Sequence, residues 1–299
     1  MLRFALSDEK KIIQDIWTKD GSSGFNNYYF SLAYPKGLHY LLINDEIESV
    51  ASVYKHEMML HGRKLKVSMI AGIKTKLGYQ GIGNEKVLLD EVMSQLSRQD
   101  LITITHAKNK ELYEAKGFKV AYLRNCYHFE RYNFDGVEIN GISHEFDTQD
   151  LAKAYKEFTS RFNGYILRDK AYFDELVVEL EFRKMNIMAI YLDNEIKGYF
   201  SFKLDGDKLY INECIYKDIK TLAKIISYSL KLAKDVYLYV SEAEHLERVF
   251  KQADYKTSEY MMLRINDYDL FNQLYNSNVS EVNEALTLIN YPLFIREDL

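Results

Sequence analysis

Apolar and polar residues alternate along two stretches of the chain, one in each half, and each stretch predicts a β-hairpin. The first is Leu41–Ser52, with a turn at Asn44-Asp45, and the second is Ile190–Ser201, with a turn at Asp193-Asn194. An apolar run that meets an Asn/Asp turn and then a second alternating run is typical of two antiparallel strands. The likeness of the two stretches predicts an internal repeat.

A second pair of similar segments extends this repeat. Tyr113–Phe118 and Phe250–Tyr255 each end an amphipathic stretch and precede an expected strand. The two members of this pair are closer in sequence than the two hairpins, which indicates a deletion in the second half. We place it at the connection His56–Lys66, which we expect to be long in the first half and shortened around Leu204–Asp207.

Within each half, the expected order is helix, strand hairpin, strand, helix, strand, helix, strand. In the first half the helices are Ser7–Lys19, Asn84–Ser97 and Lys110–Lys116, and the strands are Leu38–Ile43, Ser49–His56, Val67–Thr75, Leu101–Thr105 and Phe118–Leu123. This order predicts an α+β fold with a mixed, partly antiparallel sheet in both halves. Asn, Gly and Ser cluster near 131–145, so we expect domains at 1–135 and 140–268. A tail with a helical stretch, Ser280–Leu288, follows at 269–299.

Composition narrows the classes of function. The chain has 47% hydrophobic and 28% charged residues and a net charge of −5 without a basic block, which argues against nucleic acid as a partner. The two cysteines, Cys126 and Cys214, are too few for a disulfide framework or a thiolate zinc site, and we expect no metal. No apolar run is long enough to span a bilayer and the start is charged, so we expect a cytoplasmic protein without membrane contact.

The candidate chemistry is concentrated in Ile73–Leu89, where a strand ends, glycines crowd a turn and a helix begins. Glycine allows a ligand to approach the backbone closely, and the free amides at a helix start attract anions. A phosphate or pyrophosphate therefore fits this turn. The nucleotide fingerprints GxGxxG and GxxxxGK[ST] are both absent.

Two motifs in this region resemble the Gcn5-related N-acetyltransferase (GNAT) superfamily. The run Gln80-Gly81-Ile82-Gly83-Asn84-Glu85 is similar to its acyl-CoA loop, Arg/Gln-x-x-Gly-x-Gly/Ala, except that Glu85 replaces a small residue. Tyr113, Gly117 and Phe118 match its Tyr-x-x-x-Gly-Phe signature. The resemblance implies two tandem GNAT folds.

Within the superfamily, the chain resembles the enhanced intracellular survival (Eis) proteins. Thr75, Tyr79, Gln80 and Gly83 match their loop, with Leu77 where proline is usual. Segments of the second half are similar to their central domain: Arg168-Asp169, Tyr172, Gly198-Tyr199, Asn212-Glu213 and Met261–Arg264. We expect no counterpart of the third, sterol-carrier-like domain of these relatives in the residues after Ile265.

The resemblance implies transfer of acetyl from acetyl-CoA, the co-substrate, to a primary amine by direct attack without a covalent acyl-enzyme. Strand residues Ile73, Lys74 and Thr75 would hold the pantetheine arm, and the loop Gln80, Gly81, Ile82, Gly83, Asn84 and Glu85 would hold the pyrophosphate. Tyr113 would act as general acid toward the CoA thiolate. In the repeat, Asp218 and Lys220 stand opposite Gly81 and Gly83, so we expect the second fold to be degenerate and to bind no cofactor.

For the base that accepts the amine proton, the sequence offers His56, Glu57, His106 and Glu213. In the Eis proteins the terminal carboxylate has this role, which implies Leu299 here. The apolar segment Tyr291–Ile295 favours docking of the tail, whereas the alternative is that Arg296–Leu299 is a solvated end.

Two alternatives to the enzyme remain open at this stage. One is a noncatalytic acyl-CoA-binding or interaction module. The other is a two-lobed aminoacyl transferase that uses charged tRNA, although such a protein would not need Gly81 and Gly83. The expected partner is a small-molecule or peptide amine, and a homo-oligomer is compatible with the sequence.

Overall fold

The computed structural model describes residues 1–18, 26, 28–106, 109–130 and 137–297. The first half contains β1 (Leu2–Phe4), η1 (Ser7–Glu9), α1 (Lys10–Thr18), η2 (Tyr29–Ala33), η3 (Tyr34–Lys36), β2 (Leu38–Ile43), β3 (Ile47–Leu60), β4 (Arg63–Thr75), α3 (Asn84–Leu96), β5 (Ile102–Thr105), α4 (Lys110–Glu114) and β6 (Lys119–Glu130). The second half contains β7 (Ile142–Ser143), α5 (Thr148–Thr159), β8 (Tyr165–Ile166), α6 (Lys170–Phe182), β9 (Asn186–Leu192), β10 (Glu195–Asp205), β11 (Lys208–Tyr216), α7 (Ile219–Leu232), β12 (Asp235–Ser241), η5 (Glu242–Glu244), η6 (Leu246–Arg248) and β13 (Asp254–Ile265). The tail adds α8 (Tyr268–Tyr275) and α9 (Val282–Leu286).

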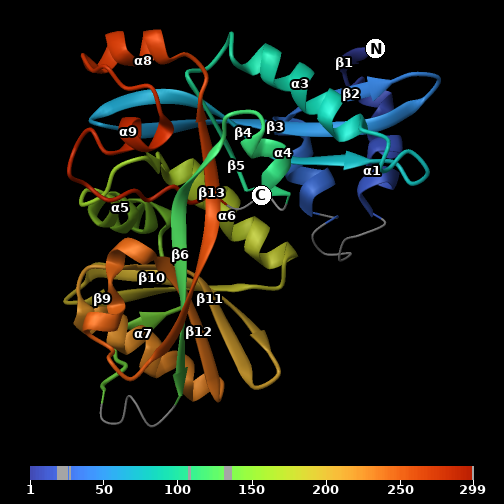
Figure 1. Cartoon of the computed structure of the whole chain (residues 1–299). Helices are drawn as coiled ribbons and strands as arrows, with labels where there is room; N and C mark the ends of the chain where they lie inside the picture. Colours follow the sequence, from blue (N-terminus) through green and yellow to red (C-terminus); the bar gives the residue numbers. More distant parts are fainter. Residues whose placement is uncertain (19–25, 27, 107–108, 131–136, 298–299) are drawn as a thin grey trace.

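The described strands join in a single mixed sheet that runs through both halves (Figure 1). Its order is β1-β2-β3-β4-β5-β13-β6-β12-β11-β10-β9-β7, with β8 beside β3. The last strand of each half is therefore exchanged: β13 lies between β5 and β6, and β6 lies between β13 and β12. Figure 1 shows β6 and β13 side by side where the two halves meet.

The structure confirms the α+β class and the tandem repeat. The series β2-β3-β4-α3-β5-β6 of the first half recurs as β9-β10-β11-α7-β12-β13 in the second. The predicted turn between β9 and β10 has Asp193 and Asn194 at φ 53° and 61°, the left-handed geometry of a tight hairpin. The boundaries 1–135, 140–268 and 269–299 stay a prediction, since β6 and β13 each pair across the division.

The second fold is degenerate at its helix start. The carboxylate Oδ1 of Asp218 accepts hydrogen bonds from the Thr221 amide at 2.8 Å and from its hydroxyl at 2.9 Å, and so caps α7. Asp218 is the N-cap residue of α7 as Gly83 is that of α3, so the predicted match of Asp218 with Gly81 is wrong by two residues. Its carboxylate occupies the position that a phosphate would take at this helix.

The prediction of a long connection at His56–Lys66 is wrong. β3 and β4 stay paired as far as Leu60 and Arg63, with only His61 and Gly62 in the turn, at φ 47° and 75°. This end of the hairpin is partly exposed, so β3 and β4 carry polar side chains here. These polar residues interrupt the apolar alternation from which a strand is predicted. β6 is also longer than the predicted Phe118–Leu123, because its second part pairs with β12. The first helix begins as the 3-10 turn Ser7–Glu9, and its predicted end at Lys19 lies outside the described residues.

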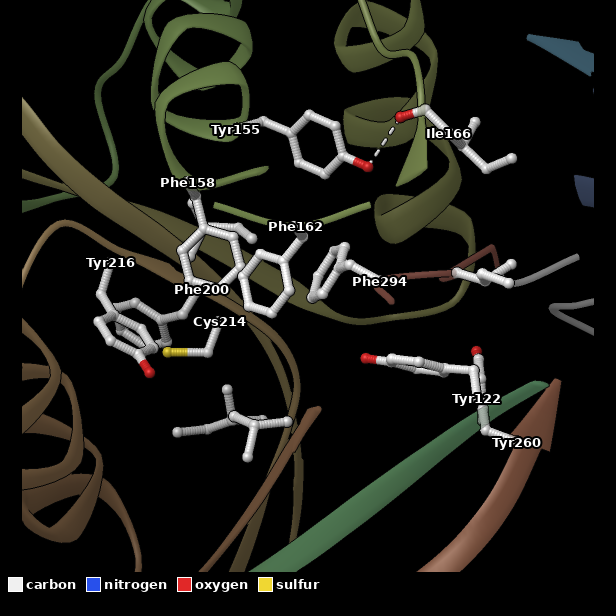
Figure 2. Packing of buried hydrophobic residues seen from close by; sticks show 14 of the residues in the cluster. Tyr122, Tyr155, Phe158, Phe162, Ile166, Phe200, Cys214, Tyr216, Tyr260 and Phe294 are labelled. Carbon is white, nitrogen blue, oxygen red and sulfur yellow. Dashed lines mark hydrogen bonds between the residues drawn. The ribbon is translucent and has the colours of Figure 1, made fainter. Parts of the chain in front are cut away.

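Among the described residues, three apolar clusters hold the elements together. The largest joins the halves and encloses Phe294 of the tail, whose ring lies 5.4 Å from Phe158, 5.1 Å from Phe162 and 6.0 Å from Tyr122. Figure 2 shows these aromatic rings around Phe294, with the Tyr155 hydroxyl donating to the Ile166 carbonyl. In the part of the chain that the structure describes, every helix is too short or too polar to cross a membrane.

Candidate functional site

The two central parallel strands of the first half separate before they end. Pairing between β4 and β5 stops at Ile70 and Thr105, whereas β4 continues to Thr75. A bulge at Ala71 interrupts the register with β3 at the same level. The next residue, Gly72, is covered by Trp17 of α1: a Cβ there would lie 2.8 Å from the indole ring. Beyond Ile70, the described part of β4 continues to Thr75 in register with β3 and no longer with β5.

The loop after β4 carries the predicted glycines. Gly78, Gly81 and Gly83 have φ values of 96°, 77° and 94°, and a Cβ on any of them would meet no atom within 4 Å. The glycines therefore serve the backbone conformation and leave the loop surface open. Ile82 is 68% exposed, and α3 starts directly after Gly83, at Asn84. The Gln80 amide donates to the Thr75 carbonyl at 3.3 Å and so folds the loop back onto β4.

Two carboxylates from the β2–β3 hairpin hold this loop, and neither was predicted from the sequence. Glu48 is buried and accepts hydrogen bonds from the Asn84 side chain at 2.9 Å, and its backbone carbonyl accepts from the Lys76 amide at 2.8 Å. Glu46 accepts from the Tyr79 hydroxyl at 2.7 Å and pairs with Lys76. Both residues lie at the start of β3 or just before it, and pairing of β3 with β4 brings them beside the loop, which the local sequence does not reveal.

Tyr113 lies on α4, in the apolar cluster beside the end of β4. It is 6% exposed, shares the cluster with Ile73 and packs edge-on against Phe118 at 5.4 Å. Burial raises the pKa of Tyr113 to about 12, although a hydrogen bond with Thr105 acts in the opposite direction. Thr105 is the last residue of β5 before the strands separate. The hydroxyl is therefore a protonated donor at neutral pH, at the level of the divergence.

The four predicted bases occupy different environments. His106 directly follows β5, with its ring 4.7 Å from Tyr260, so it lies at the divergence. His56 pairs with Val67, inside the closed part of β3 and β4, and Glu57 forms an exposed ion pair with Lys64 at 2.6 Å. Glu213 is buried in the second half, where burial raises the pKa of its carboxyl but Arg168 and Arg296 together lower it further. Of these four, it is His106 that adjoins the point where β4 and β5 part.

The tail is docked as far as the structure describes it. Arg296 and Glu297 are both 4% exposed, so the expectation of a solvated end is wrong for these two residues. Burial of the apolar Phe294 and Ile295 brings them into the interior, where each finds an opposite charge. Leu299 lies outside the described residues, and its role stays a prediction.

Elsewhere in the described residues, His128, Glu130 and Asp235 place their ligand atoms within 4.8 Å of one another. His128 is already hydrogen-bonded to Asp235 at 2.8 Å. Cys126 and Cys214 are free thiols.

Comparison with known proteins agrees with this geometry. Residues 24–121 match the model of the acetyltransferase (GNAT) domain family. Among curated proteins, no sequence matches the chain. The fold is shared with a conserved Enterococcus faecalis protein described as a probable N-acyltransferase, with a TM-score of 0.78 and 17% identity over 91% of this chain and 74% of that one.

Two further structures extend the likeness. A GCN5-related N-acetyltransferase from Anabaena variabilis has a TM-score of 0.75 and 14% identity over 90% of this chain and 74% of that one. Eis1 from Mycobacterium abscessus has a TM-score of 0.68 and 11% identity over 91% of this chain and 75% of that one. The chain thus combines a first half that matches the GNAT acetyltransferase family with a tandem fold that resembles the Eis proteins.

Proposed function

We propose that this protein is an N-acetyltransferase that moves acetyl from acetyl-CoA to a primary amine, and that the site lies where β4 and β5 separate. The observation that carries the proposal is the continuity of three features: the end of β4 beyond its pairing with β5, the open glycine loop, and the start of α3. Together they offer a strand edge for an extended arm and a helix start for phosphates.

The residues present fit a CoA thioester. Amides at Gly81–Asn84 suit a pyrophosphate, because the loop is open and the helix dipole favours negative charge there. Ile73, Lys74 and Thr75 would hydrogen-bond the amide-bearing arm through their backbone. Glu85, in the first turn of α3, is exposed, and its negative charge would repel a phosphate. The family loop has a small residue at this position.

Proximity supplies most of the rate in such a reaction, because amine and thioester are held in attacking geometry. Acetyl-CoA supplies an activated acyl group. A bond forms between the amine nitrogen and the carbonyl carbon, the carbon–sulfur bond breaks, and the Tyr113 hydroxyl donates its proton to the leaving sulfur. The amine proton passes to a base, for which His106 and the carboxylate of Leu299 stay candidates.

The acceptor is proposed to be a small-molecule or peptide amine. The expectations of a cytoplasmic location and of a homo-oligomer stay predictions. The second half, with Asp218 in the place of a phosphate, would serve as scaffold and as part of the acceptor site.

The double variant Gly81→Asp, Gly83→Lys introduces into the loop the two residue types that the sequence repeat places opposite these glycines. The first substitution would set a carboxylate where phosphates bind and the second would add bulk, so we expect acetyl-CoA affinity to fall at least tenfold, about 1.4 kcal/mol, by titration calorimetry. The matched control is Gly206→Asp in the β10–β11 turn, which is also an open position with positive φ, 58°. Unchanged binding in a folded double variant would remove the loop from the site.

A further inference from the structure

A buried ionic network connects the second half to the tail. Nη1 of Arg168 donates to Oε2 of Glu213 at 2.9 Å, and Nη2 donates to the backbone carbonyl of Arg296 at 3.0 Å. Nη2 also lies 3.4 Å from Oε2 of Glu297. The Arg168 side chain is 2% exposed and stacks on the rings of Tyr155 and Tyr172.

Two tyrosines and a second arginine complete the network. The Tyr199 hydroxyl donates to Oε1 of Glu213 at 2.6 Å, and the Tyr172 hydroxyl donates to Oε1 of Glu297 at 2.8 Å. Arg296 pairs with Glu213 at 3.4 Å. Two guanidinium groups and two carboxylates balance, so no net charge is buried. The residues that resemble the Eis central domain thus meet at the tail.

The network by itself is expected to contribute little to the free energy of unfolding. Desolvation of buried ion pairs offsets much of their attraction, and apolar side chains of similar volume often stabilise a core as well. What the network adds is register: only one alignment of the tail puts the Arg296 carbonyl and the Glu297 carboxylate onto Arg168. Apolar packing of Phe294 and Ile295 would not distinguish neighbouring alignments as sharply.

Two series of contacts connect the fixed segment to the elements of the transfer site. Tyr172 sits on α6, and the same helix carries Glu179, which accepts a hydrogen bond at 2.7 Å from Tyr28 of the first half. Tyr28 belongs to the cluster that covers Ala71 on β4. On the other side, Phe294, Tyr122, Tyr260 and His106 form a series of ring contacts of 4.7 to 6.0 Å that ends at the divergence of β4 and β5; Figure 2 shows the first three of these side chains.

We propose that Arg168 is a positioning residue that fixes the tail segment Phe294–Glu297 as a wall of the acceptor-amine site. The inference rests on the proposed function for the identity of that site. Arg168 touches neither substrate. It acts by holding Glu297 and the Arg296 backbone, and Tyr172 assists from the same side.

The test compares Arg168→Gln, Tyr172→Phe and, as matched control, Lys170→Gln. The control removes an exposed ion pair with Asp174 on the same helix, away from the tail. Tyr172→Phe removes one hydroxyl, and it keeps the test informative if Arg168→Gln does not fold. Hydrogen exchange is followed at the Phe294 amide, which donates to the Asn163 carbonyl. Acetyl-CoA affinity and the kinetic constants for the acceptor amine are measured on the same samples.

We expect exchange at Phe294 to quicken about tenfold or more in both tail variants. We expect kcat/KM for the amine to fall at least about tenfold while acetyl-CoA affinity stays unchanged, because misplacement of a site wall by about 1 Å can cost 10²-fold. Normal exchange in the variants would overturn the proposal. Faster exchange with unchanged amine kinetics would show that Arg168 has only a structural role, and this result would also overturn the proposal. If the wild type acetylates no amine, the proposed function fails, and exchange alone then decides whether Arg168 fixes the tail.

Discussion

Tyr113→Phe is expected to lower turnover by about 10²–10⁴ while acetyl-CoA affinity stays nearly the same. The change removes one hydroxyl and little volume from a side chain that packs against Phe118. Without that hydroxyl, the leaving sulfur departs as an unprotonated thiolate. The measurement is steady-state release of thiol from acetyl-CoA at saturating amine, with affinity followed by calorimetry.

Tyr40→Phe is the matched control, since Tyr40 is a buried tyrosine of the same apolar cluster. Turnover of Tyr113→Phe within about threefold of wild type would make Tyr113 structural, since a general acid contributes far more than that. Because burial raises the pKa of Tyr113 to about 12, its hydroxyl stays protonated through neutral and mildly alkaline pH. Loss of activity at lower pH must therefore arise from protonation of the amine or its base and should persist in the phenylalanine variant.

Separation of the two halves is expected to abolish folding of the first. In residues 1–135 alone, β6 would lose both of its neighbours, β13 and β12, and β5 would lose β13. Ile102 and Ile104, fully buried in the whole protein, would lie at an open sheet edge. We expect no cooperative thermal transition and no acetyl-CoA binding for this fragment.

Co-expression of 1–135 with 136–299 provides the control. The exchanged strands supply all missing pairs, so the two fragments are expected to associate and to recover acetyl-CoA binding. A cooperative transition and full-affinity binding in residues 1–135 alone would show that the exchanged strands are dispensable for the first fold.

The sequence predicted best what depends on local geometry. The loop Gln80–Glu85 and the Asp193-Asn194 turn need left-handed or open backbone, and only a few residue types allow it. The apolar period placed β2 and α3 almost to the residue. These features follow from neighbours in the chain.

Features that depend on distant partners were missed. The sequence pattern of Lys119–Glu130 predicts a strand but does not show that this strand pairs with β13 and β12. Its backbone amides and carbonyls could hydrogen-bond to the edge of any other strand. Glu48 resembles any hairpin carboxylate until Asn84 is seen beside it. The same holds for Arg296 and Glu297: charged residues near a chain end are usually solvated, and the burial of these two depends on opposite charges on Glu213 and Arg168, which lie far away in the sequence.

A panel of amines mixed with acetyl-CoA, followed by thiol release and by mass spectrometry of the amine, tests whether the protein is an N-acetyltransferase. The panel should span aminoglycosides, polyamines, peptides and protein lysines. We predict that at least one primary amine is acetylated, that thiol release depends on that amine, and that release is lost in the Gly81→Asp, Gly83→Lys variant. Acetyl-CoA binding without acetylation of any amine would contradict the account and would make the protein a noncatalytic acyl-CoA-binding module.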